Sequence, residues 1–226
     1  MSSATYDRSG TGWTASQDAS KTADAVFLRH GETALTPQRR FSGIGSGNPG
    51  LSRVGVEQAR QAAGSPLLRR SEFTEVVCSP LKRCVETAEA VAAHLGLGLR
   101  VEENLREADF GMWEGMTYAE VEERYPRDLA AWKRSPDVAP TGSTETFTDV
   151  LGRAETIADA IRSKYSGASI IAVTHVSPVK ALVAQALGAP PMALFAMELH
   201  PAAFSRISYS GSGASLRLFN DTSHLG

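Results

Sequence analysis

The chain has 226 residues, and its 23 Lys and Arg residues against 25 Asp and Glu residues give a formal net charge of −2 at pH 7. This balance argues against a protein whose overall electric field attracts nucleic acid or an acidic membrane surface, so a few positioned groups must hold any anionic ligand. The two cysteines, Cys78 and Cys84, are too few for a disulfide framework and lack the C-x-x-C spacing of a zinc site. A reducing cytoplasm is the simplest location to infer from this cysteine usage.

Residues 1–22 differ in composition from the rest of the chain. Nine of these 22 residues are Ser or Thr, and they contain no apolar run. Signal peptides and membrane anchors both need a continuous hydrophobic stretch, so neither is predicted here. We expect a disordered tail or linker over 1–22 and one folded domain over 23–226.

The folded part begins with a short apolar run over 25–28. The run stops at Arg29-His30-Gly31, as a buried parallel strand that ends in a loop would. A segment rich in glycine and proline over 36–50 predicts a loop. Ser52 then caps a helix that extends to about Ala63.

The next elements repeat this order of strand and helix. Residues 74–78 predict a second buried strand. Ser79 and Pro80 follow as the expected N-cap and first residue of a helix, which Gly96 ends. A short strand is expected over 97–101.

Residues 102–143 are less regular, although Thr117 and Glu120 have the spacing of a capping box for a short helix. The later predicted elements, in chain order, are a loop over 136–140, a helix over 146–165, a buried strand over 169–174, a helix from Ser177-Pro178 to Gly188, and a hairpin of strands near 203–209 and 214–219. Strands that alternate with helices predict an α/β fold, here a three-layer α/β/α sandwich with a mostly parallel central sheet.

Polar side chains follow three of the predicted strands. In parallel sheets the ligand binds beyond the carboxyl ends of the strands, where Arg29-His30, Ser79 with Arg83, and His175 would meet. Two histidines at matching positions suggest catalysis, whereas no third ligand stands at metal spacing next to either one. The planar guanidinium groups of Arg29 and Arg83 suit a phosphate.

A carboxylate for proton transfer is the remaining candidate. Glu107 lies in an irregular, aromatic-rich segment, where a carboxyl group can act as a general acid. From the residues alone, Asp109 and Glu114 compete equally with Glu107 for this role.

Four motifs, in order, resemble those of the histidine phosphatase superfamily, which includes cofactor-dependent phosphoglycerate mutases. The motifs are Leu28-Arg29-His30-Gly31-Glu32-Thr33, the segment Cys78-Ser79-Pro80-Leu81-Lys82-Arg83-Cys84-Val85-Glu86-Thr87, the segment from Arg106-Glu107 to Glu114-Gly115, and Val173-Thr174-His175. A narrower likeness, carried by residues 33–43 and 219–225, is to the α-ribazole phosphatase-like acid phosphatase half of actinobacterial ribonuclease H fusion proteins. Residues 1–22 lie where such a fusion would join.

The resemblance implies a phosphoglycerate mutase-like fold and a hydrolase that cleaves a small phosphomonoester without a metal ion or other cofactor. His30 is the implied nucleophile and Glu107 the implied acid, while Arg29, Arg83 and His175 would spread positive charge over the phosphoryl oxygens. The implied substrate-binding residues are Gly31, Thr36, Arg40, Phe41, Ser42, Gly43, Glu145 and Val176. Thr36 replaces an asparagine found in many relatives, the loop from Gly43 looks about two residues longer than usual, and Ser143-Thr144-Glu145-Thr146 replaces a Gly-Glu-Ser segment.

Several functions stay open at this point. The substrate implied by the resemblance is α-ribazole 5′-phosphate, and a broad-specificity acid phosphatase is the nearest alternative. A phosphoglycerate mutase-type phosphotransferase is less favoured, because the segment from Glu107 to His175 looks short for a mutase. A non-catalytic phospholigand-binding protein on the same fold is disfavoured because all five key residues are present. The expected partner is a small phosphorylated molecule, with neither nucleic acid nor membrane, and Phe195, Met197 or Leu199 would suit a homodimer.

Overall fold

The computed structural model describes residues 22–45, 47–69, 73–211 and 213–226. The tail expected over 1–22 therefore lies almost entirely outside the described residues. The strands are β1 (Ala23–Arg29), β2 (Phe73–Cys78), β3 (Leu99–Val101), β4 (Ser169–Thr174), β5 (Phe204–Ser210) and β6 (Gly213–Asp221). The helices are α1 (Arg53–Ala63), α2 (Pro66–Arg69), α3 (Lys82–Leu95), α4 (Tyr118–Arg124), α5 (Pro126–Trp132), α6 (Phe147–Lys164) and α7 (Val176–Leu187).

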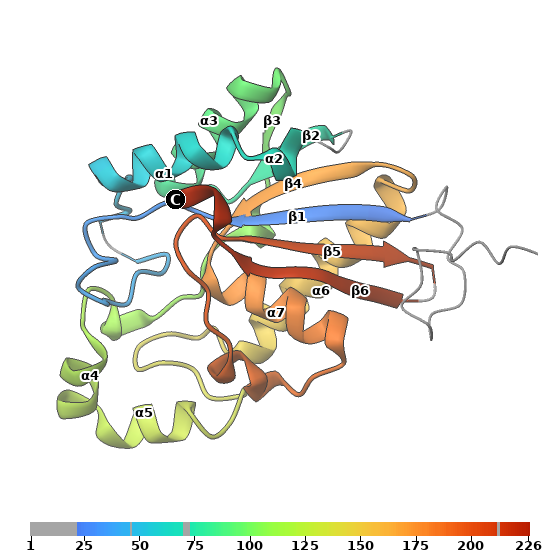
Figure 1. Ribbon diagram of the computed structural model, residues 1–226. Coiled ribbons are helices and arrows are strands. Elements are labelled where there is room, and N and C mark those ends of the chain that lie inside the picture. The colour runs from blue at the N-terminus through green and yellow to red at the C-terminus, as the bar shows by residue number, and fades with distance from the viewer. Residues whose placement is uncertain (1–21, 46, 70–72, 212) are drawn as a thin grey trace, which may run out of the picture.

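The six strands form one sheet in the order β3-β2-β4-β1-β5-β6. The first four of these strands are parallel, and β5 and β6 continue the sheet as an antiparallel hairpin. Helices α1 to α3 cover one face, and α6 and α7 cover the other (Figure 1). The predicted three-layer sandwich with a mostly parallel sheet is confirmed.

Successive side chains of each central strand pack into two different cores, one on each face of the sheet. In β1, Ala25 and Phe27 belong to the core beneath α6 and α7, whereas Val26 and Leu28 belong to the core beneath α1 and α3. Successive side chains of a strand point to opposite faces, so a strand buried on both sides needs an unbroken apolar run. This is why the short apolar runs of the sequence predicted central strands.

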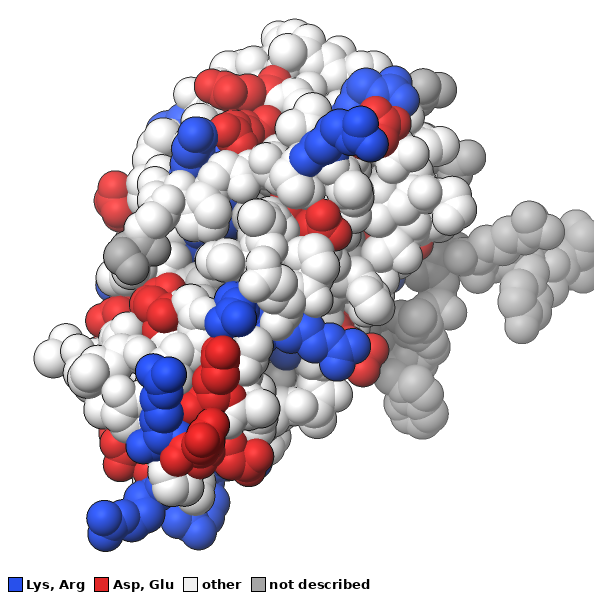
Figure 2. All heavy atoms as spheres, turned by 90° about the vertical axis from the view of Figure 1, so that its left-hand side faces the viewer, with Lys and Arg blue, Asp and Glu red and all other residues white. Residues whose placement is uncertain are grey.

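The strand register brings the predicted polar residues to one edge of the sheet. Arg29 is aligned with Thr174 across β1 and β4, and Cys78 is aligned with Val173 across β2 and β4. The residues that follow these strands, among them His30, therefore lie side by side. The face that they share carries Lys and Arg interspersed with Asp and Glu, without a large area of one sign (Figure 2).

Several predicted helix boundaries hold and two do not. Ser52 caps α1, and the predicted capping box begins α4. A second capping box, which was not predicted, begins α6. The helix expected from Ser79 begins at Lys82 instead, with Leu81 at its N-cap, because the Ser79 hydroxyl is directed to His175. Helix α7 begins at Val176, one residue earlier than expected.

The short helices α2 and α5 were not predicted. Four and seven residues are too few to show a clear helical period. Within the described part of the chain, no helix is long and apolar enough to cross a membrane.

Candidate active site

His30 follows the last residue of β1 and is 6% exposed. Its Nδ1 lies 2.7 Å from the carbonyl oxygen of Gly31, which can only accept, so Nδ1 carries the proton. The Nε–H of Arg83 donates to His30 Nε2 at 3.2 Å. These two contacts fix the tautomer that leaves a lone pair on Nε2, the atom that a nucleophilic histidine needs.

The surroundings also keep this ring neutral. Burial, together with the positive charges of Arg83 and Arg29, holds the pKa of His30 well below its ordinary value of 6.5. Both causes act against the protonated ring, which would have no lone pair for attack. His30 is therefore ready to attack without first losing a proton.

Two arginines flank His30, and each has a buried N–H group without a partner among the described residues. Arg29 Nη1 donates to the carbonyl of Leu199 at 2.5 Å, and Arg83 Nη2 donates to the carbonyls of Ser42 and Gly43 at 2.9 and 3.1 Å. Arg29 Nε and Arg83 Nη1 remain unsatisfied. Burial lowers the pKa of Arg29 to about 10, so both guanidinium groups stay charged at neutral pH. Unpaired buried donors on cations form a site for an anion.

His175 lies behind His30, with ring centroids 5.1 Å apart, and is fully buried. Its Nε2 lies 2.7 Å from the hydroxyl of Ser79 and 3.3 Å from the thiol of Cys84. Burial and the nearby charge of Arg83 hold its pKa well below 6.5. This shift favours the neutral ring in the site without a ligand, and the role of His175 in supplying positive charge to a phosphoryl group stays a prediction. Sequence reasoning did not identify Ser79 or Cys84 as its partners.

The carboxylate of Glu107 faces the start of helix α7. It accepts hydrogen bonds from the backbone N–H groups of Val176 at 3.0 Å and Ser177 at 3.2 Å, and from that of Ala108 at 2.9 Å. The side chain lines the pocket while the residue is only 4% exposed. This contact brings the acid motif next to the second histidine, which is the residue before Val176.

The two rival carboxylates are directed elsewhere. Asp109 accepts from the N–H of Gly111 and the hydroxyl of Ser143. Glu114 accepts from the N–H groups of Gly43 and Gly45 and so shapes the loop behind Arg83. Neither carboxylate lines the pocket that contains His30, which favours Glu107 as the acid.

Glu145 does not line the pocket, contrary to its expected place at the substrate rim. Its Oε1 accepts from Arg106 at 2.8 Å and Arg153 at 3.0 Å, and its Oε2 accepts from the N–H of Asp109 at 2.8 Å. Arg153 Nη1 in turn donates to the carbonyls of Asn104 and Arg106. The Glu145 carboxylate therefore holds the chain in place on both sides of Glu107, through the side chain of Arg106 and the N–H of Asp109.

We expect Glu145→Gln to lower the free energy of unfolding by about 3 kcal/mol, because it leaves two partly buried guanidinium groups without their shared anion. Urea denaturation followed by circular dichroism measures this. Glu57→Gln is the matched control, since the Glu57–Arg60 pair is exposed and contributes little. Equal free energies of unfolding for the two variants would contradict this stabilising role of Glu145.

The other predicted binding residues divide into two groups. Thr36, Arg40, Phe41, Ser42 and Val176 line the pocket. Gly31 and Gly43 do not: a Cβ on Gly31 would lie 2.5 Å from the carbonyl oxygen of Gly55, and one on Gly43 would lie 2.1 Å from that of Ala108. These two glycines are needed for close backbone packing. The guanidinium of Arg40 is held by Glu120 and by the carbonyl of Gly115.

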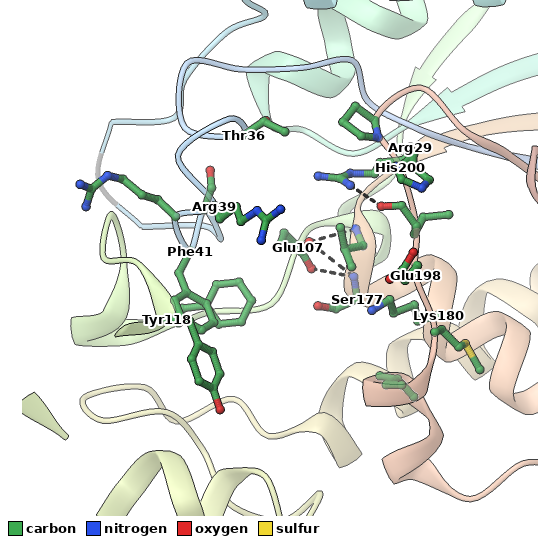
Figure 3. A pocket seen from close by; sticks show the side chains of 18 of the residues that line it. Arg29, Thr36, Arg39, Phe41, Glu107, Tyr118, Ser177, Lys180, Glu198 and His200 are labelled. Atoms are coloured by element: carbon green, nitrogen blue, oxygen red, sulfur yellow. Dashed lines mark hydrogen bonds between the residues drawn. The ribbon is translucent and has the colours of Figure 1, made fainter. Parts of the chain in front are cut away.

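The pocket has a volume of about 820 Å³ and is lined at one end by His30 and Arg29. Figure 3 shows Arg29 and other lining residues. Sequence reasoning missed much of its lining. Arg39, Tyr118, Trp132, Phe147, Lys180, Leu194, Glu198 and His200 all contribute. Phe195, Met197 and Leu199, which were expected to serve a dimer, also line it. The pocket thus leads from the buried residues Arg29 and His30 to a wide chamber with one aromatic wall.

Comparison with known proteins identifies the family to which this arrangement belongs. The model of the histidine phosphatase superfamily (branch 1) matches residues 25–222. The chain belongs to this superfamily. The match includes all four motifs on which the resemblance to this superfamily rested.

Individual relatives agree with this assignment. The chain is 41% identical over 223 residues to the bifunctional protein Rv2228c of Mycobacterium tuberculosis, covering 98% of this chain and 60% of that protein. It is 29% identical over 201 residues to phosphoserine phosphatase 1 of Hydrogenobacter thermophilus, covering 89% of this chain and 93% of that protein. The crystal structure of the alpha-ribazole phosphatase from Shigella flexneri matches with a TM-score of 0.75 at 26% identity, covering 88% of this chain and 96% of that chain.

Proposed function

We propose that this chain is a phosphomonoesterase that works through a phosphohistidine at His30. The observation that carries the proposal is the neutral His30 ring with its Nε2 lone pair between two charged arginines that keep unsatisfied N–H groups. Membership of the histidine phosphatase superfamily and the phosphatase names of two relatives support it. The chain spans 60% of the length of the bifunctional relative, so activities of any longer protein are not included in the proposal.

In the first step, His30 Nε2 attacks phosphorus, the N–P bond forms, and the bond from phosphorus to the alcohol oxygen breaks. The Arg83 Nε–H that now donates to Nε2 is redirected to a phosphoryl oxygen. Arg29 and Arg83 stabilise the charge on the equatorial oxygens, and the resemblance to the family gives His175 a share in this role. Glu107, protonated at this stage, gives its proton to the leaving oxygen.

In the second step, water attacks the phosphohistidine. Glu107, now ionised, takes a proton from this water, the N–P bond breaks, and inorganic phosphate leaves. Two moderate barriers replace one high barrier. His30 returns to its neutral form, and the alcohol has already departed.

The substrate that we favour is α-ribazole 5′-phosphate, with a broad range of small phosphomonoesters as the alternative. The structural likeness to an alpha-ribazole phosphatase supports the first, and the likeness to a phosphoserine phosphatase supports the second. We retain a reducing cytoplasm as the predicted location, in keeping with the free, buried thiols of Cys78 and Cys84. Domain limits of 23–226 and a homodimer stay predictions as well.

The test is a panel of phosphomonoesters, including α-ribazole 5′-phosphate, p-nitrophenyl phosphate and phosphoserine, with release of inorganic phosphate as the readout. We expect multiple turnovers without added bisphosphoglycerate. Transfer of the phosphoryl group between phosphoglycerates, with no net phosphate release, would favour the mutase alternative. Binding of phosphate esters without any turnover would favour the non-catalytic alternative.

Chelation of metal ions should leave the activity unchanged within about twofold. The two guanidinium groups beside His30 already supply the positive charge that a metal ion would otherwise provide. The rate of p-nitrophenyl phosphate hydrolysis before and after dialysis against EDTA checks this expectation. A large loss that Mg²⁺ or Zn²⁺ restores would show that the arginines do not suffice.

A further inference from the structure

The pocket holds much more than a phosphoryl group. A volume of about 820 Å³ is in the range that encloses a drug-sized molecule. Only two residues of the Arg29–His30–Arg83 cluster, Arg29 and His30, line this space. The remaining lining must therefore contact the alcohol part of the substrate, whose chemistry it should reflect.

One wall of the pocket is aromatic. Trp132 packs against Phe147 and Phe195 with ring centroids 4.9 Å apart in both cases, and the latter two rings lie 5.3 Å apart. Phe195 nevertheless remains 43% exposed at the pocket. Contact of this surface with an apolar or aromatic group of a ligand would remove apolar area from water and so favour binding.

Lys180 is the unusual member of the lining. It is the one charged residue of helix α7, and it is half-buried in the pocket wall. Among the described residues, its ammonium group forms no hydrogen bond or ion pair, although the charges of Glu107 and Glu198 act on it from a distance. Burial lowers the pKa of Lys180, as expected for an ammonium group that lacks a close partner.

The position of Lys180 relates it to the alcohol part of a substrate. Val176, whose N–H binds Glu107, lies four residues earlier on the same helix, so the two side chains share a face about 6 Å apart. In the proposed mechanism Glu107 contacts the leaving oxygen. Lys180 lies one helical turn beyond Val176, the residue that binds Glu107. Figure 3 shows Glu107 between Lys180 on one side and Phe41 and Tyr118 on the other.

We propose that Lys180 binds an anionic group on the alcohol part of an aromatic phosphomonoester. This inference rests on the proposed phosphatase function and adds a substrate class within its broad-specificity alternative, because the alcohol part of α-ribazole 5′-phosphate carries no anionic group. Lys180 is then a specificity-determining residue rather than a member of the phosphoryl site. An anion at this place would give the half-buried ammonium group the partner that it lacks.

Two aryl phosphates with similar leaving groups test the inference: phenyl phosphate and 4-(carboxymethyl)phenyl phosphate. We expect the protein to prefer the carboxylated ester by about tenfold in kcat/KM, the size of one charge-assisted contact. Lys180→Met should remove this preference by raising KM for the carboxylated ester about tenfold, with kcat and phenyl phosphate hydrolysis nearly unchanged. Lys180→Arg should retain the preference.

Lys164→Met is the matched control, because Lys164 is at the far end of α6 and pairs with Glu75. An equal loss on both esters in Lys180→Met would overturn the inference, since Lys180 would then act on the phosphoryl group itself. Equal hydrolysis of both esters by the unmodified protein would also overturn it. Failure of the unmodified protein to release phosphate from any ester would instead overturn the proposed function.

Discussion

His30→Ala should abolish phosphomonoesterase activity, with a loss of about 10⁴-fold or more in kcat. The variant lacks the atom that we assign to attack phosphorus, the Nε2 that Gly31 and Arg83 hold in the unprotonated form. The remaining arginines can still bind the ester. We therefore expect phosphate binding to persist while turnover stops.

The measurement is p-nitrophenol release, with thermal unfolding to confirm that the variant is folded. His94→Ala serves as the control, because His94 is exposed in the last turn of α3 and should be dispensable. A second readout is the covalent intermediate. Unmodified protein quenched during turnover should carry an acid-labile phosphoryl group, and His30→Ala should carry none. Comparable turnover by the two histidine variants would refute the assigned nucleophile.

The cluster around His30 was predictable because local rules determine it. Apolar runs buried on both faces mark the central strands, and parallel strands end at the same edge. Arg29, His30 and His175 directly follow such runs, so the sequence alone places them together. Arg83 is the second residue of the next helix, α3, and therefore lies at the same edge of the sheet.

The role of Glu145 could not be predicted from such local rules. Its partners Arg106 and Arg153 are 39 and 8 residues away, and the pairing depends on how α6 packs beside the acid segment. The prediction that a helix starts at Ser79 was wrong for a related reason. A Ser-Pro pair is a good start for a helix, but the Ser79 hydroxyl has a hydrogen-bond partner in His175, which follows a strand and lies 96 residues later in the chain.

Most of the chamber for the alcohol part was missed. Phe147 has the pattern of an ordinary core residue and Phe195 suited a dimer, and only tertiary packing turns them with Trp132 toward one pocket. Lys180 did leave a signal. A single charged residue in the otherwise apolar helix α7 indicates either a cost to stability or a ligand.

Glu107→Gln should separate the two chemical steps. The amide cannot protonate a leaving alkoxide, so turnover of an alkyl ester such as β-glycerophosphate should fall by about 10³-fold. The p-nitrophenolate ion departs without a proton, so phosphorylation of His30 by p-nitrophenyl phosphate should stay fast. Hydrolysis of the phosphohistidine should be slow, because the amide cannot accept a proton from water.

Rapid mixing of Glu107→Gln with p-nitrophenyl phosphate should therefore give a burst of one p-nitrophenol per site, followed by slow turnover. Asp109→Asn tests the rival carboxylate and should show no burst, since Asp109 binds Gly111 and Ser143 outside the pocket. The glutamine variant also turns an NH2 group toward backbone N–H donors of α7, so its unfolding must be measured in parallel. A folded Glu107→Gln variant with unchanged steady-state rates on the alkyl ester would remove Glu107 from the mechanism. A burst from Asp109→Asn would move the acid two residues along the chain, to a carboxylate that the structure directs away from His30.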